Sequence, residues 1–180
     1  FIGIATALFE GGMTSSLIRV SGIDTNDYST VFYFNLGVSL LVYSLFFLLA
    51  PYIAQFYRQP ILTEIARVYG LSFIFLAFGT VQNTILTREM DFKKQAVITL
   101  PALFIGSVLG VILACNGFGV WSLVYSMLTT NLLTSIFLWF SSDWSPQLIF
   151  DIDKFKLHFY FGYNMTLSSL LEIIFTNISQ

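Results

Sequence analysis

The stretch "LTREMDFKKQ", Leu86–Gln95, carries five charged residues within seven positions. The sequence on either side of it is uncharged over long distances, from residue 68 to 87 before it and from residue 95 to 142 after it. A spanning helix needs about 20 apolar residues to cross a hydrocarbon core of about 30 Å. The charged stretch therefore predicts a loop between two membrane-spanning helices.

The composition of the whole chain agrees with a membrane location. Of its 180 residues, 56% are hydrophobic and only 10% are charged, whereas roughly a quarter of the residues in a soluble domain are charged. These values predict an all-α, polytopic transmembrane bundle. The single cysteine, Cys115, excludes an internal disulfide and a thiolate metal cluster. We expect no cofactor and no metal site.

The uncharged runs set the number of spans. Residues 28–57 are long enough to cross the membrane once, and residues 95–142 are about twice that length and must fold back. The turn "NGFG", Asn116–Gly119, predicts a hairpin of helices over roughly 95–115 and 118–140, because glycine readily ends a helix. With a partial helix at each terminus, we expect about six spans. The chain then reads as an internal piece of a larger protein, incomplete at both ends.

The basic residues predict which loops are cytoplasmic. Alternate loops lie on the same side of the membrane, and the first, third and fifth loops together hold six Lys and Arg residues against two in the other loops. Cationic loops stay on the cytoplasmic side, so "LTREMDFKKQ" is predicted to be cytoplasmic. We divide the chain into a helical bundle over 1–142, an interfacial linker over 143–157, and the start of a further span over 158–180.

Two of the expected helices carry a row of polar side chains along one face, which we call a polar stripe. A third carries a row of small residues. The small residues Ala102, Gly106, Gly110 and Ala114 recur every fourth position, which indicates close helix packing or a sliding surface. The polar side chains face other helices or a wet cavity, because unpaired polar groups are costly in hydrocarbon. Interhelical hydrogen bonding and a substrate path explain them equally well. The candidate cavity-lining residues are Asn83, Thr84, Thr87, Ser126, Thr130 and Asn131.

Two carboxylates and one histidine complete the set of candidates. Glu10 and Glu172 lie at membrane depth in the sequence, where an ionisable group is a functional candidate by default. Gly11 and Gly12 follow Glu10 and weaken the helix there, so Glu10 is a candidate for ion coupling or gating. His158 has no neighbouring Cys or His in the sequence, and we expect no catalytic role for it.

Several segments also resemble a known family. They are "FEGGMTSSLIR", "DYSTVFYFNLGVSLLVYSLFFLLAPYIAQFY", "LTREMDFKKQA", "GFGVWSLV" and "LWFSSDWSPQLIF". In order and spacing they resemble Wzx-type polysaccharide flippases of the multidrug/oligosaccharidyl-lipid/polysaccharide exporter superfamily. The resemblance implies a bacterial inner-membrane transporter of two bundles, in which this chain runs from the second helix, through a MATE-like N-terminal lobe, into the seventh.

The resemblance also implies a substrate and partners. Relatives move undecaprenyl-pyrophosphate-linked oligosaccharide repeat units across the inner membrane by alternating access, for lipopolysaccharide, capsule or exopolysaccharide synthesis. Arg19 and Arg88 are the candidate contacts for the anionic headgroup, although both residues equally suit anchors for helix ends beside anionic lipid. We expect contacts with membrane lipids, a polysaccharide polymerase and glycosyltransferases, and none with nucleic acid.

Two other functions remain open at this point. A cation-coupled multidrug exporter of the same superfamily would need an aromatic and acidic cavity more than cationic contacts. A non-transporting scaffold of a glycan-assembly complex would need no solvated cavity. An enzyme is not expected, because the sequence holds no catalytic constellation.

Overall fold

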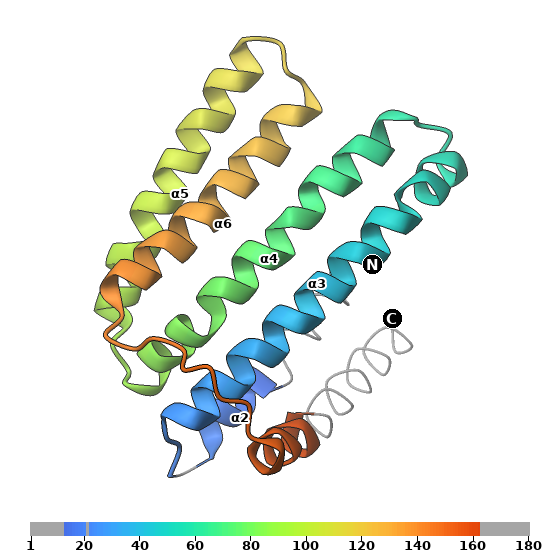
Figure 1. The fold of residues 1–180 in the computed structure, drawn as a ribbon. Helices are drawn as coiled ribbons and strands as arrows, with labels where there is room; N and C mark the ends of the chain where they lie inside the picture. The colour runs from blue at the N-terminus through green and yellow to red at the C-terminus, as the bar shows by residue number, and fades with distance from the viewer. Residues whose placement is uncertain (1–12, 21, 163–180) are drawn as a thin grey trace, which may run out of the picture.

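Five helices make up most of the part of the chain that the structure, a computed structural model, describes, namely residues 13–20 and 22–162. They are α2 (Met13–Arg19), α3 (Thr25–Phe56), α4 (Ile61–Arg88), α5 (Phe92–Cys115) and α6 (Val120–Ser141) (Figure 1). A further helical segment begins at residue 152 and continues to the last described position, 162. The prediction of an all-α bundle is confirmed.

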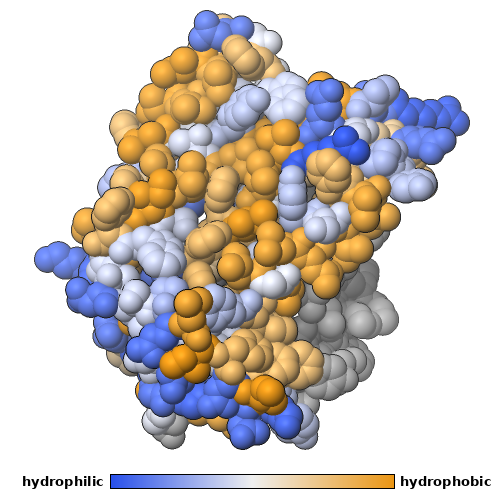
Figure 2. Space-filling model, in the orientation of Figure 1, coloured by the Kyte–Doolittle hydropathy of each residue, from blue (hydrophilic) through white to orange (hydrophobic). Residues whose placement is uncertain are grey.

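The four long helices, α3 to α6, stand side by side in the order α5, α6, α4, α3 (Figure 1). All four are long and apolar enough to cross a membrane. Their outward residues are large and hydrophobic, such as Leu48, Phe104 and Leu123 with exposed fractions of 66%, 70% and 71%. On the face seen in Figure 2, hydrophobic residues cover the middle and hydrophilic ones gather toward the two ends. Contact of such an apolar surface with water costs much free energy, whereas contact with lipid tails does not.

Three of the helices end in the same way. The N–H groups of Gln59, Asp91 and Phe118 donate to carbonyls five residues earlier, at 2.9, 3.0 and 3.1 Å. The residue before each donor has positive φ, namely Arg58 (54°), Met90 (56°) and Gly117 (82°). This is the Schellman motif, which satisfies carbonyls at the helix end. It allows the chain to reverse direction between Arg88, the last residue of α4, and Phe92, the first residue of α5.

Acidic side chains begin two of the helices. Asp91 caps α5 by accepting a hydrogen bond from the N–H of Lys94 at 3.0 Å, and the helix begins at Phe92, three residues before the expected start at Gln95. As a result, Pro101 lies about two and a half turns into α5 at 3.6 residues per turn, in the interior of the helix. Asp24 and Asp27 form a capping box at the start of α3, where each side chain accepts from the other's backbone N–H.

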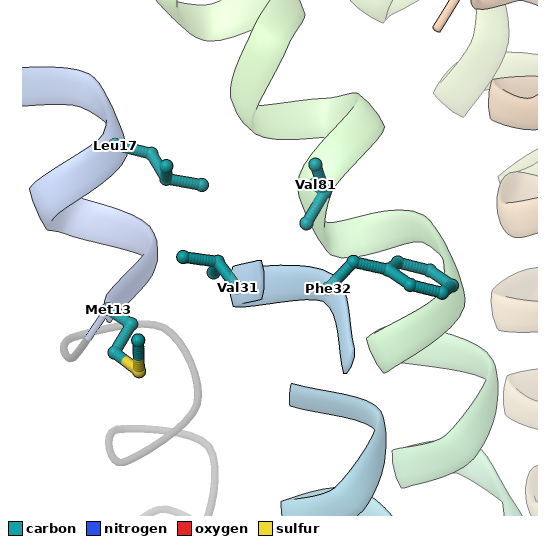
Figure 3. Close-up of a cluster of buried hydrophobic side chains, with 5 residues drawn as sticks. All are labelled: Met13, Leu17, Val31, Phe32 and Val81. Atoms are coloured by element: carbon teal, nitrogen blue, oxygen red, sulfur yellow. The ribbon is translucent and has the colours of Figure 1, made fainter. Parts of the chain in front are cut away.

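The apolar core lies where α2, α3 and α4 meet. Met13 and Leu17 of α2 pack against Val31 and Phe32 of α3 and Val81 of α4 (Figure 3). Each of these five side chains is at most 4% exposed. This cluster holds the short helix α2 against the two longer ones.

The pair α5 and α6 packs through small residues and hydroxyls. Ser126 Oγ donates to the carbonyl of Gly106 at 2.8 Å. A Cβ atom at Gly106 would lie 2.0 Å from Thr130 Oγ1 and 2.9 Å from the backbone oxygen of Ser126. The close approach of the two backbones therefore requires glycine at position 106. Ala102 is also buried, but Ala114, the last member of the small-residue series, is exposed.

Replacing Gly106 by alanine should lower the stability of the α5–α6 pair by about 1 to 3 kcal/mol, because overpacking moves the backbone of α6. Thermal unfolding of the purified protein in detergent measures the change. The matched control is Gly37→Ala on α3, where an added Cβ would meet nothing within 4 Å. Equal midpoints for the two variants would show that the close approach is not needed.

The Met90→Gly variant should be more stable by about 1 kcal/mol, because a residue with a side chain is strained at positive φ. Met90 is 76% exposed, so little packing is lost. Gly117→Ala should shift the unfolding midpoint in the opposite direction, since φ at Gly117 is 82° and the added Cβ would meet no neighbour. A Met90→Gly variant less stable than the parent would contradict this account of the turn.

Candidate functional site

One end of the bundle collects most of the charge. The loop after α2, the loop between α4 and α5 and the chain after α6 all lie there, over residues 19–27, 86–95 and 141–158 (Figure 1). We call this region the charged end. Six of the eight Lys and Arg residues of the chain lie in it. The structure thus groups the first, third and fifth loops at one end, as the sequence predicted.

The chain after α6 is fastened to the start of α3. The backbone N–H groups of Gln147 and Asp151 donate to the hydroxyls of Ser29 and Thr30 at 3.1 and 3.2 Å. The ring of Trp144 lies edge-on to Phe32 with their centroids 6.1 Å apart. The segment expected to be an interfacial linker has neither helix nor strand over residues 142–151, bonds to the start of α3, and becomes helical from residue 152.

An ionic cluster joins this helix to the capping box of α3. Lys154 Nζ donates to Asp27 Oδ2 at 2.8 Å and also to Asp24 Oδ1. The hydrogen bond from Lys154 and those between the two aspartates lower the pKa of Asp24 well below its usual range. Burial alone would lower the pKa of Lys154, but its hydrogen bonds with Asp24 and Asp27 outweigh burial and raise it. Asp24 and Lys154 therefore both remain charged near neutral pH.

The histidine lies at the buried side of this cluster. His158 is 0% exposed, its Nε2 lies 2.9 Å from Asp27 Oδ1, and its Nδ1 lies 2.6 Å from Ser16 Oγ. A serine, a histidine and an aspartate in a row resemble the order of a catalytic triad. Ser16 is also 0% exposed, however, so no substrate reaches its hydroxyl. The three residues join α2, α3 and the helix from residue 152.

A cavity of about 300 Å³ lies at the charged end between α4, α5 and α6. Polar and charged side chains from residues 82–94 and 141–144 line it. The indole Nε1 of Trp144 is buried and has no hydrogen-bond partner among the described residues. The polar lining residues are Gln82, Glu89, Lys94, Ser141, Ser142, Asp143 and Trp144. A neutral, hydrogen-bonding ligand fits this mixture better than an anion does, because two carboxylates stand against one lysine.

The two candidate headgroup residues differ in their surroundings. Arg19, the last residue of α2, is exposed. Arg88, the last residue of α4, donates from its guanidinium to the carbonyl of Leu17 at 2.7 Å. That carbonyl lies in the last turn of α2, and carbonyls of a last turn have no hydrogen-bond partner inside their own helix. Arg88 thus ties α2 to α4, whereas the guanidinium of Arg19 faces outward.

The polar stripe before Arg88 bonds mainly to its own helix. Thr84 and Thr87 donate to the carbonyls of Thr80 and Asn83, four residues earlier, at 2.7 and 2.9 Å. The side chain of Asn83 accepts from Gln95 Nε2 of α5 at 2.7 Å. Thr84 is 3% exposed. These groups need no water or ligand to satisfy them in this structure.

The polar stripe of α6 lies against α5. Ser126 bonds to Gly106 as described above, and Thr130 donates to the carbonyl of Ser126 at 2.9 Å. Asn131 differs, because its Nδ2 is buried and has no hydrogen-bond partner among the described residues. The stripe therefore includes two hydroxyls used in helix contacts and one amide nitrogen that lacks an acceptor.

The other predicted groups lie elsewhere. Glu10 and Glu172 fall outside the described residues. No group of three or more His, Cys, Asp or Glu side chains in the described part of the chain is arranged to hold a metal ion. The sequence did not reveal the contact of His158 with Ser16 and Asp27, since 142 and 131 residues separate them. A useful sign was available: a lone histidine close to a span, which must be hydrogen-bonded if it is buried.

Comparisons with known proteins give a consistent picture. A family model described as "Polysaccharide biosynthesis protein" matches residues 1–180. The succinoglycan biosynthesis transport protein ExoT of Rhizobium meliloti is 27% identical over 91% of this chain and 33% of its own length. The lipopolysaccharide biosynthesis protein WzxC of Escherichia coli is 24% identical over 99% of this chain and 37% of its own length.

A third relative is the teichuronic acid biosynthesis protein TuaB of Bacillus subtilis, 22% identical over 98% of this chain and 37% of its own length. The chain thus spans about a third of the length of the curated relatives that it matches. No solved structure matches it significantly. The resemblance drawn from the sequence and the expectation that the chain is not an enzyme agree with these relatives.

Proposed function

Because the chain belongs to the polysaccharide biosynthesis protein family, which matches its full length, we propose that it forms part of a membrane flippase. The substrate is a lipid-linked oligosaccharide repeat unit, carried from the cytoplasmic to the outer leaflet of the bacterial inner membrane by alternating access. The family match is the observation that carries this proposal. The relatives are named for three different polymers, so the proposal specifies lipid-linked glycan and not its sugars.

The charge distribution supports an anionic lipid substrate. A lipid pyrophosphate must leave water and enter a medium of low dielectric constant, and nearby cations lower the cost of that step. Six of the eight basic residues of the chain lie at the charged end, which the positive-inside rule assigns to the cytoplasm. Arg19 is our candidate for first contact, since it is exposed there. Arg88 acts beside it and also holds the end of α2.

The cavity at the charged end supports binding of the glycan. Its carboxylates accept hydrogen bonds, and its amide and hydroxyl groups both accept and donate them. The indole N–H of Trp144, which has no partner among the described residues, offers a further donor. Sugar hydroxyls need partners of both kinds, so we assign this cavity to the first sugars of the repeat unit.

The remaining candidates keep the roles that the sequence gave them. Glu10 is proposed to couple transport to an ion or to gate it. Asn83, Thr84, Thr87, Ser126, Thr130 and Asn131 are proposed to border the path, with helix packing as their second role. Asn131 is the strongest of these, because its buried Nδ2 has no acceptor within the described part of the chain, and a substrate or a second bundle can supply one.

Changing Arg19 to glutamine in the intact transporter should reduce translocation of the lipid-linked repeat unit about tenfold, because a hydrogen bond to a charged group contributes roughly 1.5 kcal/mol or more. The assay is appearance of the repeat unit in the outer leaflet of cells that lack their own flippase. The matched control is Arg58→Gln, the same change at an exposed position of the opposite end, which should retain activity.

The same assay distinguishes the rival functions. Cells that expel dyes but do not translocate the repeat unit would show a multidrug exporter instead. If variants lose the polymer but translocate the repeat unit as well as the parent does, the protein is a scaffold of a glycan-assembly complex. Equal activity of the Arg19→Gln and Arg58→Gln variants would remove Arg19 from the headgroup site.

A further inference from the structure

The side chain of His158 has two close partners and no contact with solvent. It is 0% exposed, with Asp27 Oδ1 at 2.9 Å from Nε2 and Ser16 Oγ at 2.6 Å from Nδ1. The ring therefore cannot exchange protein partners for water without moving. Its protonation state has to match what these two neighbours can donate and accept.

The hydrogen bonds that Asp27 accepts indicate that Nε2 of His158 carries a proton. The other carboxylate oxygen of Asp27 accepts from Lys154 Nζ at 2.8 Å and from the backbone N–H of Asp24 at 2.9 Å. A carboxylate that accepts from an ammonium and a backbone amide is ionised and can only accept. Nε2 must then donate to it, whichever state the rest of the ring adopts.

The partners of the other ring nitrogen, Nδ1, distinguish a neutral ring from a doubly protonated one. Ser16 Oγ lies 2.5 Å from the carbonyl oxygen of Met13, and that oxygen can only accept. The serine hydroxyl has one proton, which it can give to Met13 or to Nδ1 but not to both. If Nδ1 is protonated it donates to Ser16, and Ser16 donates to Met13. The contacts of Ser16 with Nδ1 and with Met13 can therefore both be hydrogen bonds only when both ring nitrogens carry a proton.

The surrounding charges favour that state. With a protonated ring, the cluster holds two carboxylates, one ammonium and one imidazolium and is neutral. The neutral ring leaves one excess negative charge beside a buried group, which is costly in a medium of low dielectric constant. Besides Asp24, Asp27 and Lys154, the titratable and charged groups of the elements packed around it include the following: Tyr28 of α3, Arg88 of α4, Arg19 of α2, and Asp151, Asp153, Lys156 and Tyr160 of its own segment.

We propose that Asp27, His158 and Ser16 form a proton-binding site, and that the bound proton fastens the helical segment at residues 152–162 to α2 and α3. Loss of the proton removes either the bond from Nδ1 to Ser16 or the bond from Ser16 to Met13, and unbalances the charge of the cluster. Asp24 and Lys154 stay charged between pH 5 and 8, because the pKa of Asp24 is lowered and that of Lys154 is raised. Histidine is the residue type that ordinarily changes charge in this range.

Hydrogen–deuterium exchange of residues 152–158 in the intact protein tests the site. Exchange is measured at several values between pH 5 and 8, after correction for the intrinsic effect of pH on amide exchange. We expect these amides to exchange several-fold faster at pH 8 than at pH 5. The His158→Gln variant should lose this dependence, because glutamine fills the position with a hydrogen-bonding but uncharged side chain. The test does not depend on the proposed transport activity.

Two further variants separate the site from general effects. Lys156→Gln removes a cation from an exposed position of the same segment and should keep the wild-type pH dependence. Ser16→Ala removes the acceptor of the second proton but leaves the bond to Asp27, and should move the midpoint of the transition to lower pH. The proposal is overturned if the wild-type protein shows no pH dependence, or if His158→Gln shows the same dependence as the wild type.

Discussion

The carboxylate of Asp27 is the group on which the charged end of this protein depends. It accepts from the backbone of Asp24 at the start of α3, from Lys154 in the segment that follows α6, and from the ring of His158. The bonds from Lys154 and His158 join parts of the chain that are far apart in sequence, whereas the bond from Asp24 is local. Asp27 is 5% exposed, and a buried carboxylate without such partners would be strongly destabilising. The packing of the segment after α6 against α3 and the stability of the buried Asp27 carboxylate therefore depend on the same hydrogen bonds.

The same constraint operates throughout the bundle in a weaker form. Lipid offers no hydrogen bonds, so each polar group within a span has to find its partner in the protein. Thr80, Thr84 and Thr87 of α4 meet this requirement with carbonyls of their own helix. Ser126 meets it across the contact with Gly106. Among the described residues the exceptions are Asn35, Arg67, Asn131 and Trp144, each with a buried nitrogen atom that has no acceptor there. These exceptions are the groups that the structure leaves available for a ligand or a further part of the protein.

Much of the fold follows from apolar length and turn residues alone. The uncharged runs located the spans, and "NGFG" located the hairpin, because both signals are local in the sequence. The start of α5 at Phe92 was missed by three residues, since the cap formed by Asp91 is a side-chain contact and not a change in hydrophobicity. That shift also moved Pro101 into the helix interior.

The cluster around His158 was beyond the reach of such arguments. Neither the spacing of Ser16 and Asp27 nor that of Lys154 and His158 marks a site, because their contacts arise only when the chain after α6 returns to α3. The polar stripes were recognised correctly as polar faces, yet sequence could not separate hydroxyls that bond to their own helix from those that line a path. Only the burial and partners of each group make that distinction.

A double-mutant cycle on Asp27 and His158 tests the central claim most directly. The free energy of unfolding of the intact protein at pH 6 is measured for Asp27→Asn, for His158→Gln and for both changes together. If the two side chains bond as described, the double variant is less destabilised than the sum of the single variants, by about 1 to 3 kcal/mol. Additive effects within about 0.5 kcal/mol would show that the two residues do not interact, and would contradict the account.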